Sequence, residues 1–154
     1  MPGNWGWLDL DGSGGATLKA NLATGATGSY TVGQSVDTEP GAKTGPVKQG
    51  LDSRFANCPA PTTDPCSDGG NPNDIPAGDP CLVVVPVVDF AAAAKAGKTS
   101  MPIEAFAEVY LEPTGPNATS ATNIGGCYVS SVVGNTISGS TQSFGPMTPP
   151  VLIQ

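Results

Sequence analysis

Glycine and proline interrupt this chain so often that long regular elements are excluded. The sequence holds 21 glycines and 16 prolines among 154 residues, about a quarter of all positions, against a usual share of about 12%. Proline breaks helices and is confined to edges and bulges in sheets, so helical bundles and coiled coils are ruled out. The composition favours many short strands joined by turns.

The charge balance excludes two classes of partner. The chain carries 6 basic and 13 acidic residues, which gives a net charge of −7. A nucleic-acid backbone would be repelled, and no basic cluster is present that would bind an anionic lipid surface. The sequence also lacks a run of about 18 apolar residues that could cross a bilayer. A chain of this length buries one core, so a single domain is predicted over residues 1–154.

The chain contains no histidine. Histidine is the commonest acid-base group at neutral pH and the commonest metal ligand, so serine and cysteine triads are excluded. Carboxylates are the remaining candidates for catalysis, and Glu104, Glu108 and Glu112 recur at every fourth position of one apolar segment. A glycosidase needs two carboxyl groups that face one sugar, and nothing singles out a pair here. We therefore predict that the protein is not an enzyme.

Four cysteines indicate an exported domain. An even number of cysteines in a chain of low charge is typical of disulfides formed in an oxidising, extracytoplasmic compartment. A zinc site would need closely spaced pairs, whereas the closest two, Cys58 and Cys66, are separated by seven residues. Four cysteines allow three pairings. Of these we favour Cys66 with Cys81 and Cys58 with Cys127.

Hydrophobic periodicity and turn residues predict the elements of the fold. Helices are expected over residues 16–23 and 45–56, and strands over 4–11, 29–36, 82–88, 103–112, 126–134 and 150–154. The fold class is therefore α+β and predominantly β, a short-stranded sheet with two short helices packed on it and held by disulfides.

Three of these elements carry more detailed expectations. The run 82–88 is the most apolar in the chain, so we expect a central strand covered on both faces, with Pro86 at a bulge or an unpaired edge. In the segment 103–112 a helix would stack three glutamates as like-charged neighbours, which favours a strand with those acids on a solvated face. Residues 57–80, rich in proline and aspartate, are expected to form a long exposed loop.

Asp9, Asp11 and Ser13 are the candidate metal ligands. Their alternate spacing before Gly14 is similar to the start of a calcium loop. The twelfth position of such a loop supplies a bidentate glutamate, and here it is Ala20. We therefore expect a turn in which Ser13 caps the following helix, with bound calcium as the alternative and no other cofactor.

Trp5 and Trp7 are the candidate interface residues. Alternate residues of a strand face the same way, so the two rings could form a platform on which a sugar stacks. The competing interpretation places them in the core or against another chain.

Two N-terminal segments resemble a known family. The first is GNWGWLDL at residues 3–10, followed by a glycine-rich turn, and the second is TEPGAKTGPV at residues 38–47, followed by Gln49–Asp52. An apolar strand ending at Asp89 and a phenylalanine-bearing strand over 103–111 follow in the expected order. The chain thus resembles the extracytoplasmic region of bacterial TadE/TadG-like proteins, most specifically over residues 3–56.

The resemblance implies a non-catalytic, minor-pilin-like or accessory component of the Flp (tight adherence) pilus, with an N-terminal membrane helix as its anchor. This sequence has no such helix, so either the anchor lies outside it or the protein is a secreted relative. The implied partners are other subunits of a surface appendage or further copies of this chain, in the bacterial periplasm, on the cell surface or secreted. The alternative function is a secreted adhesin or carbohydrate-binding module that uses Trp5 and Trp7.

Overall fold

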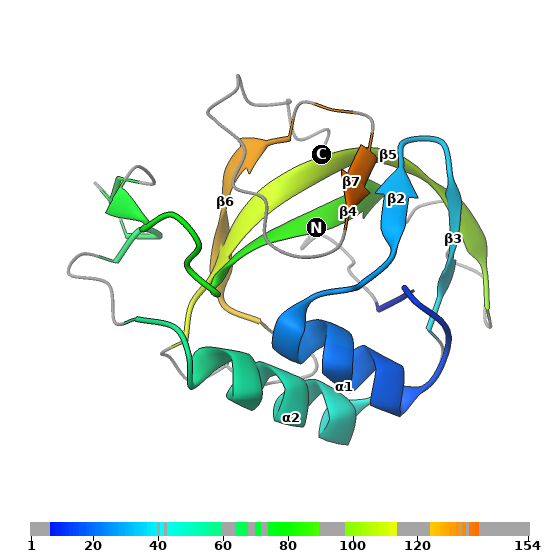
Figure 1. Ribbon diagram of the computed structural model, residues 1–154, viewed down its shortest axis with the longest axis horizontal. Helices are drawn as coiled ribbons and strands as arrows, with labels where there is room; N and C mark the ends of the chain where they lie inside the picture. The colour runs from blue at the N-terminus through cyan, green and yellow to red at the C-terminus, as the bar shows by residue number, and fades with distance from the viewer. Residues whose placement is uncertain are drawn as a thin grey trace.

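The computed structural model describes residues 7–39, 41, 43–59, 64–67, 70–71, 74–89, 98–113, 124–132 and 134, and the backbone of 136–138. It shows an antiparallel sheet with two helices beneath it (Figure 1). The elements are β1 Leu8–Asp9, α1 Gly15–Thr24, β2 Ser29–Thr31, β3 Ser35–Thr38, α2 Thr44–Phe55, β4 Leu82–Val88, β5 Ser100–Leu111, β6 Gly126–Ser131 and β7 Thr136–Ser138. The predicted α+β class is confirmed.

The twelve-residue strand β5 organises the sheet. Its first residues pair with β3, which in turn pairs with β1, and its later residues lie between β4 and β6. Strands β2 and β7 form a separate two-stranded sheet. All of these pairings are antiparallel. The predicted strand over 103–112 is confirmed, and its later half has a neighbouring strand along each edge.

The apolar strand β4 has the predicted bounds, but the prediction that it is central is wrong. Among the described residues it pairs with β5 alone. Backbone groups of alternate residues point to the partner strand in an antiparallel pair, and the N–H of Leu111 donates to the carbonyl of Cys81 at 2.8 Å. Because the backbone of Cys81 faces β5, that of Val85 also faces β5, whereas that of Pro86 faces away from it. Proline therefore lies on the open edge, where its missing N–H breaks no bond to β5.

The predicted strand over 29–36 is two strands. The chain turns at Val32 and Gly33, where the N–H of Gln34 donates to the carbonyl of Thr31 at 2.9 Å. Gly33 has φ of 88°, a value that favours glycine at the third position of a tight turn. Of the other expected strands, 4–11 contains only β1 in its described part, 126–134 contains β6, and 150–154 lies outside the described residues.

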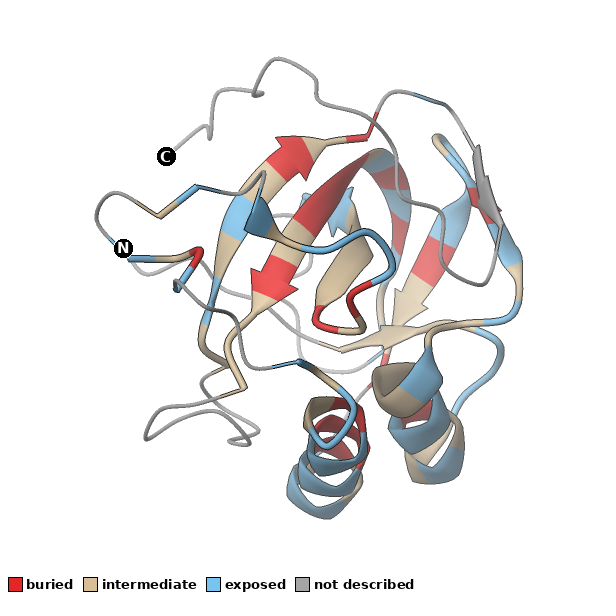
Figure 2. Ribbon diagram, turned by 60° about the vertical axis from the view of Figure 1, so that its left-hand side comes forward, coloured by how far each residue is buried: buried red, intermediate tan, exposed pale blue. Residues whose placement is uncertain are grey.

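The two helices lie side by side, as Figures 1 and 2 both show, and their predicted bounds are correct to within one residue. Gly50 permits the close approach, because a Cβ atom there would lie 2.7 Å from both the Cβ of Leu22 and the carbonyl oxygen of Lys19. Leu18, Val47 and Leu51 form the core between them. Leu111, at the end of β5, packs against this cluster and joins the helix pair to the sheet.

The second core cluster is formed by side chains of β2, β3 and β5 and of the residue that follows β6. Its buried members are Tyr30, Val36, Ile103, Phe106 and Val132. Figure 2 shows the buried positions on the strands and on the inner sides of the helices. The sheet and the helix pair therefore have separate clusters of buried side chains, and residues of β5 pack in both.

Candidate functional site

The two segments that carry the family resemblance lie against each other. Strands β1 and β3 pair with Leu8 opposite Thr38, and the N–H of Glu39 donates to the carbonyl of Trp7 at 2.8 Å. A Cβ atom on Gly15 would lie 2.8 Å from Cγ of Pro46, so the start of α1 also contacts the start of α2. These segments form one structural unit, called here the N-terminal clamp, over residues 7–15 and the described residues of 36–47.

Glu39 caps helix α1 within the clamp. Its carboxylate is buried, accepts the N–H of Gly14 at 2.9 Å and pairs with the ammonium group of Lys43 at 2.8 Å. Lys43 and then the Gly14 N–H lower the pKa of Glu39, as expected for a carboxylate at the positive end of a helix. The prediction that Ser13 caps this helix is wrong. Ser13 is exposed, and the N-cap residue is Gly14, which has no side chain; its N–H is bound by Glu39 instead.

Asp11 ties the clamp to the strand that follows α1. Its carboxylate accepts the N–H groups of Thr27 and Gly28 and the hydroxyl groups of Thr27 and Tyr30. The Tyr30 hydroxyl also accepts the N–H of Asp11 at 2.7 Å. The Tyr30 bond is the largest cause of a lowered pKa at Asp11. Burial, followed by the Asp11 hydrogen bond, raises the pKa of Tyr30 to about 12.

Asp9 is held by a different partner. Lys98 reaches its Oδ2 at 2.8 Å and the Oδ2 of Asp37 at 3.2 Å, and these acids raise the pKa of Lys98, with Asp9 contributing most. The candidate calcium ligands are thus distributed among other contacts. Asp9 is paired with a lysine, Asp11 accepts four hydrogen bonds, and Ser13 is exposed.

Trp7 is half-buried and packs against the core between the helices. This placement agrees with the core interpretation of Trp7. Trp5, the other candidate interface residue, lies outside the described residues.

The three glutamates of β5 and its end have different surroundings. Glu104 is exposed and Glu112 is half-buried, but Glu108 is only 5% exposed and accepts the hydroxyl of Ser130 at 2.5 Å. The prediction of three acids on a solvated face is therefore wrong for Glu108. The reason is that β6 runs beside this part of β5 and brings Ser130 opposite Glu108.

The four cysteines form two disulfides, as predicted, but with a different pairing. The bonds are Cys58–Cys81 and Cys66–Cys127, and the described residues contain no free cysteine. The favoured pairing of Cys66 with Cys81 and Cys58 with Cys127 is wrong. Cys81 immediately precedes β4 and lies beside the end of α2, so Cys58 is its neighbour at a Cα–Cα distance of 5.6 Å. Both bonds are typical of an oxidising, extracytoplasmic environment.

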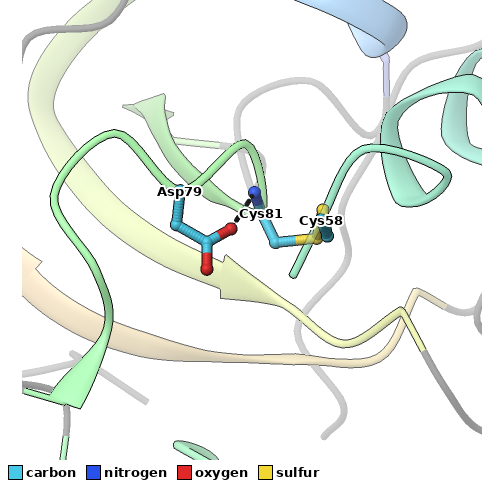
Figure 3. Close-up of side chains that lie close together, drawn as sticks. All are labelled: Cys58, Asp79 and Cys81. Carbon is cyan, nitrogen blue, oxygen red and sulfur yellow. Dashed lines mark hydrogen bonds between the residues drawn. A yellow bond between two sulfur atoms is a disulfide. The ribbon is translucent and has the colours of Figure 1, made fainter. Parts of the chain in front are cut away.

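A three-residue motif, Asp-Pro-Cys, supplies one cysteine of each disulfide. In Asp64–Cys66 and in Asp79–Cys81 the cysteine N–H donates to Oδ1 of the aspartate, at 2.9 and 2.8 Å. Figure 3 shows the second copy, with the Asp79 carboxylate next to the Cys58–Cys81 bond. Asp79 is 5% exposed, and its Oδ2 is buried without a hydrogen-bond partner. Each motif fixes the cysteine backbone at the place where its disulfide forms.

Arg54 joins α1, α2 and the second motif, a role that helical periodicity did not reveal. Its guanidinium group is buried and donates to the carbonyls of Leu22 at 2.5 Å, Pro80 at 2.6 Å and Asn21 at 3.5 Å. Two of these carbonyls belong to the last turns of α1, where a cation is favourable. Burial lowers the pKa of Arg54. The only sequence signal is an arginine near the end of an amphipathic helix.

Comparisons with known proteins do not assign a family. No family model matches the chain, and no significant match is found among curated proteins or solved structures. In the described part of the chain, neither helix has the length and hydropathy that a membrane span requires. Groups of potential metal ligands in the same residues are Cys58, Asp79 and Cys81, and Asp64, Cys66 and Glu112. The sulfur atoms of Cys58 and Cys81 are bonded to each other, and that of Cys66 is bonded to Cys127.

Proposed function

We propose that this protein is a non-catalytic, extracytoplasmic component of a bacterial surface appendage that acts by assembling with other protein subunits. The observation that supports this most is the N-terminal clamp. In the segments that resemble TadE/TadG-like proteins, the acids contact a helix end, backbone groups, a tyrosine or a lysine. Acids that are engaged in capping, hydrogen bonds and ion pairs within the fold suit a structural subunit rather than an enzyme.

The disulfides are consistent with this role. Disulfides persist outside the cytoplasm, and there they stabilise a subunit by restricting the unfolded chain. The proposed location is the periplasm or the cell surface, and the proposed relatives are the TadE/TadG-like proteins of the Flp pilus.

Assembly through strand addition at β4 is not part of this proposal. Strand addition requires a row of free N–H and C=O groups along an edge. On the edge of β4 that has no partner strand among the described residues, Pro86 has no N–H, and the N–H of Leu82 already donates to the carbonyl of Asp79 at 3.0 Å. We therefore propose contacts through side-chain surfaces of the sheet or helices.

Deletion of the gene in its bacterial source tests the proposal. We expect fewer surface pili and weaker adherence, both restored by the wild-type gene, and we expect pilus subunits to be cross-linked to the protein in intact cells. A complemented variant in which Leu51→Asp disrupts the core should fail to restore them. Normal piliation in the deletion strain, with no pilus subunit among the cross-linked proteins, would contradict the proposal.

A further inference from the structure

The side of β5 that faces away from the helices is covered by the first Asp-Pro-Cys motif. Residues directly opposite each other in an antiparallel pair project to the same face. Tyr110 lies opposite both Leu82 and Cys127, and Cys127 is bonded to Cys66. The segment around Cys66 therefore lies over the face that carries Tyr110, whereas Leu111 points to the helix pair.

Two carboxylates meet at the border of this covered face. Glu112 follows Tyr110 by two residues, and its N–H donates to the carbonyl of Gly125 at 3.0 Å, which continues the ladder with β6. One carboxylate oxygen of Glu112 and one of Asp64 lie within 4.8 Å of each other. Oxygens that bind one calcium ion at 2.3–2.6 Å are at most about 5 Å apart. The two acids are thus close enough to share a calcium ion.

The hydroxyl group of Tyr110 is an independent sign of a missing ligand. Tyr110 is 1% exposed, and its hydroxyl is buried without a hydrogen-bond partner. Such a group in a folded protein needs explanation, and a bound water or ion supplies one. After burial, the negative charges of Asp79, Asp64 and Glu112 raise the pKa of Tyr110 further, so its hydroxyl lies within their field.

No basic side chain neutralises these acids within the described residues. The ion pairs formed there involve Lys43, Lys48 and Lys98 and lie elsewhere. Room for the Glu112 carboxylate depends on Gly125, because a Cβ atom at that position would lie 2.7 Å from Glu112 Oε2. Asp64 uses Oδ1 to accept the Cys66 N–H, which leaves Oδ2 for another partner.

We propose that Asp64 and Glu112 bind a calcium ion beside the buried hydroxyl of Tyr110. Carboxylate, hydroxyl and water oxygens are the ligands that calcium takes, and it tolerates the irregular, partly hydrated geometry of such a site better than magnesium does. The ion neutralises two acids and ties the first Asp-Pro-Cys motif to the end of β5. Affinity in the range of extracellular calcium modules, a Kd of about 0.1–1 mM, is expected.

Terbium(III) luminescence tests the site on the intact, disulfide-bonded chain, because terbium replaces calcium and is excited through a nearby tyrosine. Wild-type protein should show tyrosine-sensitised emission that calcium displaces and that potassium chloride at equal ionic strength does not. Asp64→Asn, which keeps an acceptor for the Cys66 N–H, and Glu112→Gln should each weaken calcium binding by about tenfold or more. Tyr110→Phe should lose most of the emission and bind calcium more weakly, because it removes the hydroxyl oxygen beside the proposed ion.

Glu104→Gln and Asp74→Asn, exposed acids on the same strand and in the same loop region, are the matched controls and should bind like the wild type. Near-ultraviolet circular dichroism and disulfide mapping verify that each variant is folded. The proposal is overturned if calcium at about 10 mM neither binds nor raises the melting temperature. It is also overturned if magnesium binds equally well, if Glu112→Gln binds as the controls do, or if Tyr110→Phe retains full emission.

Discussion

The carboxylate of Asp11 accepts four hydrogen bonds in the N-terminal clamp, and the backbone conformation of this residue is unusual. Its φ of 61° is the only positive value among the described non-glycine residues, and aspartate and asparagine tolerate this region better than most residues. The conformation directs its carboxylate to Thr27, Gly28 and Tyr30. The hydrogen bonds that lower the pKa of Asp11 therefore also hold β2 against the turn before α1.

The lowered pKa values of Asp11 and Glu39 predict an acid-sensitive fold. Both pKa values lie below the ordinary values of 3.8 and 4.5. At acidic pH the unfolded chain therefore binds more protons than the folded one, and the stability decreases as the pH decreases. The stabilisation is complete above the ordinary values and is lost as the pH drops through the lowered ones. Urea unfolding between pH 7 and pH 2 should show the decline.

Asp11→Asn should lower the stability at pH 7 by about 1–3 kcal/mol, because charged hydrogen bonds become neutral ones. It should also flatten the acid part of the curve, while the exposed Asp74→Asn leaves the stability at pH 7 within about 0.5 kcal/mol of the wild type. An acid curve for Asp11→Asn that parallels the wild type would show that this carboxylate is not responsible.

Strand β4 has one edge without a partner strand in the described part of the chain, and that edge needs protection. Six of its seven residues are valine or leucine, and Val87 is 40% exposed. An uncharged, apolar edge strand is a template for pairing with another chain. The proline that faces outward removes a donor at the middle of that edge, so we infer that Pro86 limits self-association.

Pro86→Val should therefore increase association through β4. Sedimentation velocity at increasing concentration should show dimers or larger species for the variant under conditions in which the wild type is less associated. Adding Val87→Lys to Pro86→Val should reverse the effect, because a charge on an edge opposes pairing. Pro76→Ala, a change in an exposed loop, is the control. Equal association of Pro86→Val and the wild type would mean that another feature protects this edge.

Local sequence signals predicted the helices and the ends of β4 well. The Thr44-Gly45-Pro46 start and the spacing of Val47 and Leu51 predict the bounds of α2 to within one residue. The turn inside 29–36 was missed because a single glycine, Gly33, interrupts an otherwise alternating pattern. The neighbours of each strand could not be predicted, since pairing depends on contacts across the fold, such as that between Glu108 and Ser130.

The candidate site residues show the same limit. That the cysteines form disulfides follows from their number and setting, but their pairing depends on the path of the chain from α2 to β4. Asp9 contacts Lys98, which is 89 positions away, and Tyr30 lies 19 positions from Asp11. Distances of this kind are absent from a motif of five residues, so the spacing of Asp9, Asp11 and Ser13 could not reveal their actual partners.

The two disulfides together enclose most of the chain between α2 and β6. Cys66 lies within the segment closed by Cys58–Cys81 and bonds to Cys127 outside it, with sequence separations of 23 and 61. Loops of these lengths stabilise by about 3 and about 4 kcal/mol in the chain-entropy model. Because the segments overlap, these two values are not independent.

Paired replacement tests these contributions. Cys58→Ala with Cys81→Ala, and Cys66→Ala with Cys127→Ala, should each lower the free energy of unfolding in urea by several kcal/mol, about 2–5. Each variant should retain the other bond, as peptide mapping without reductant would show. The crossed variant, Cys58→Ala with Cys127→Ala, should leave two cysteines without their native partners. A native-like disulfide between Cys66 and Cys81 in that variant, with wild-type stability, would contradict the pairing described here.

The Cys66–Cys127 bond also determines how tension would travel through the chain. A pull applied to the two ends passes from Cys66 directly to Cys127, and the residues between them, which include β4 and β5, carry no load along their backbone. At about 3.4 Å per extended residue, the 61 positions spanned by this disulfide would add about 200 Å if they were extended, and the bond prevents that extension. The strands at the centre of the fold are thus protected from mechanical unzipping by a covalent bypass, so a stretched subunit would yield first in the segments before Cys66 and after Cys127.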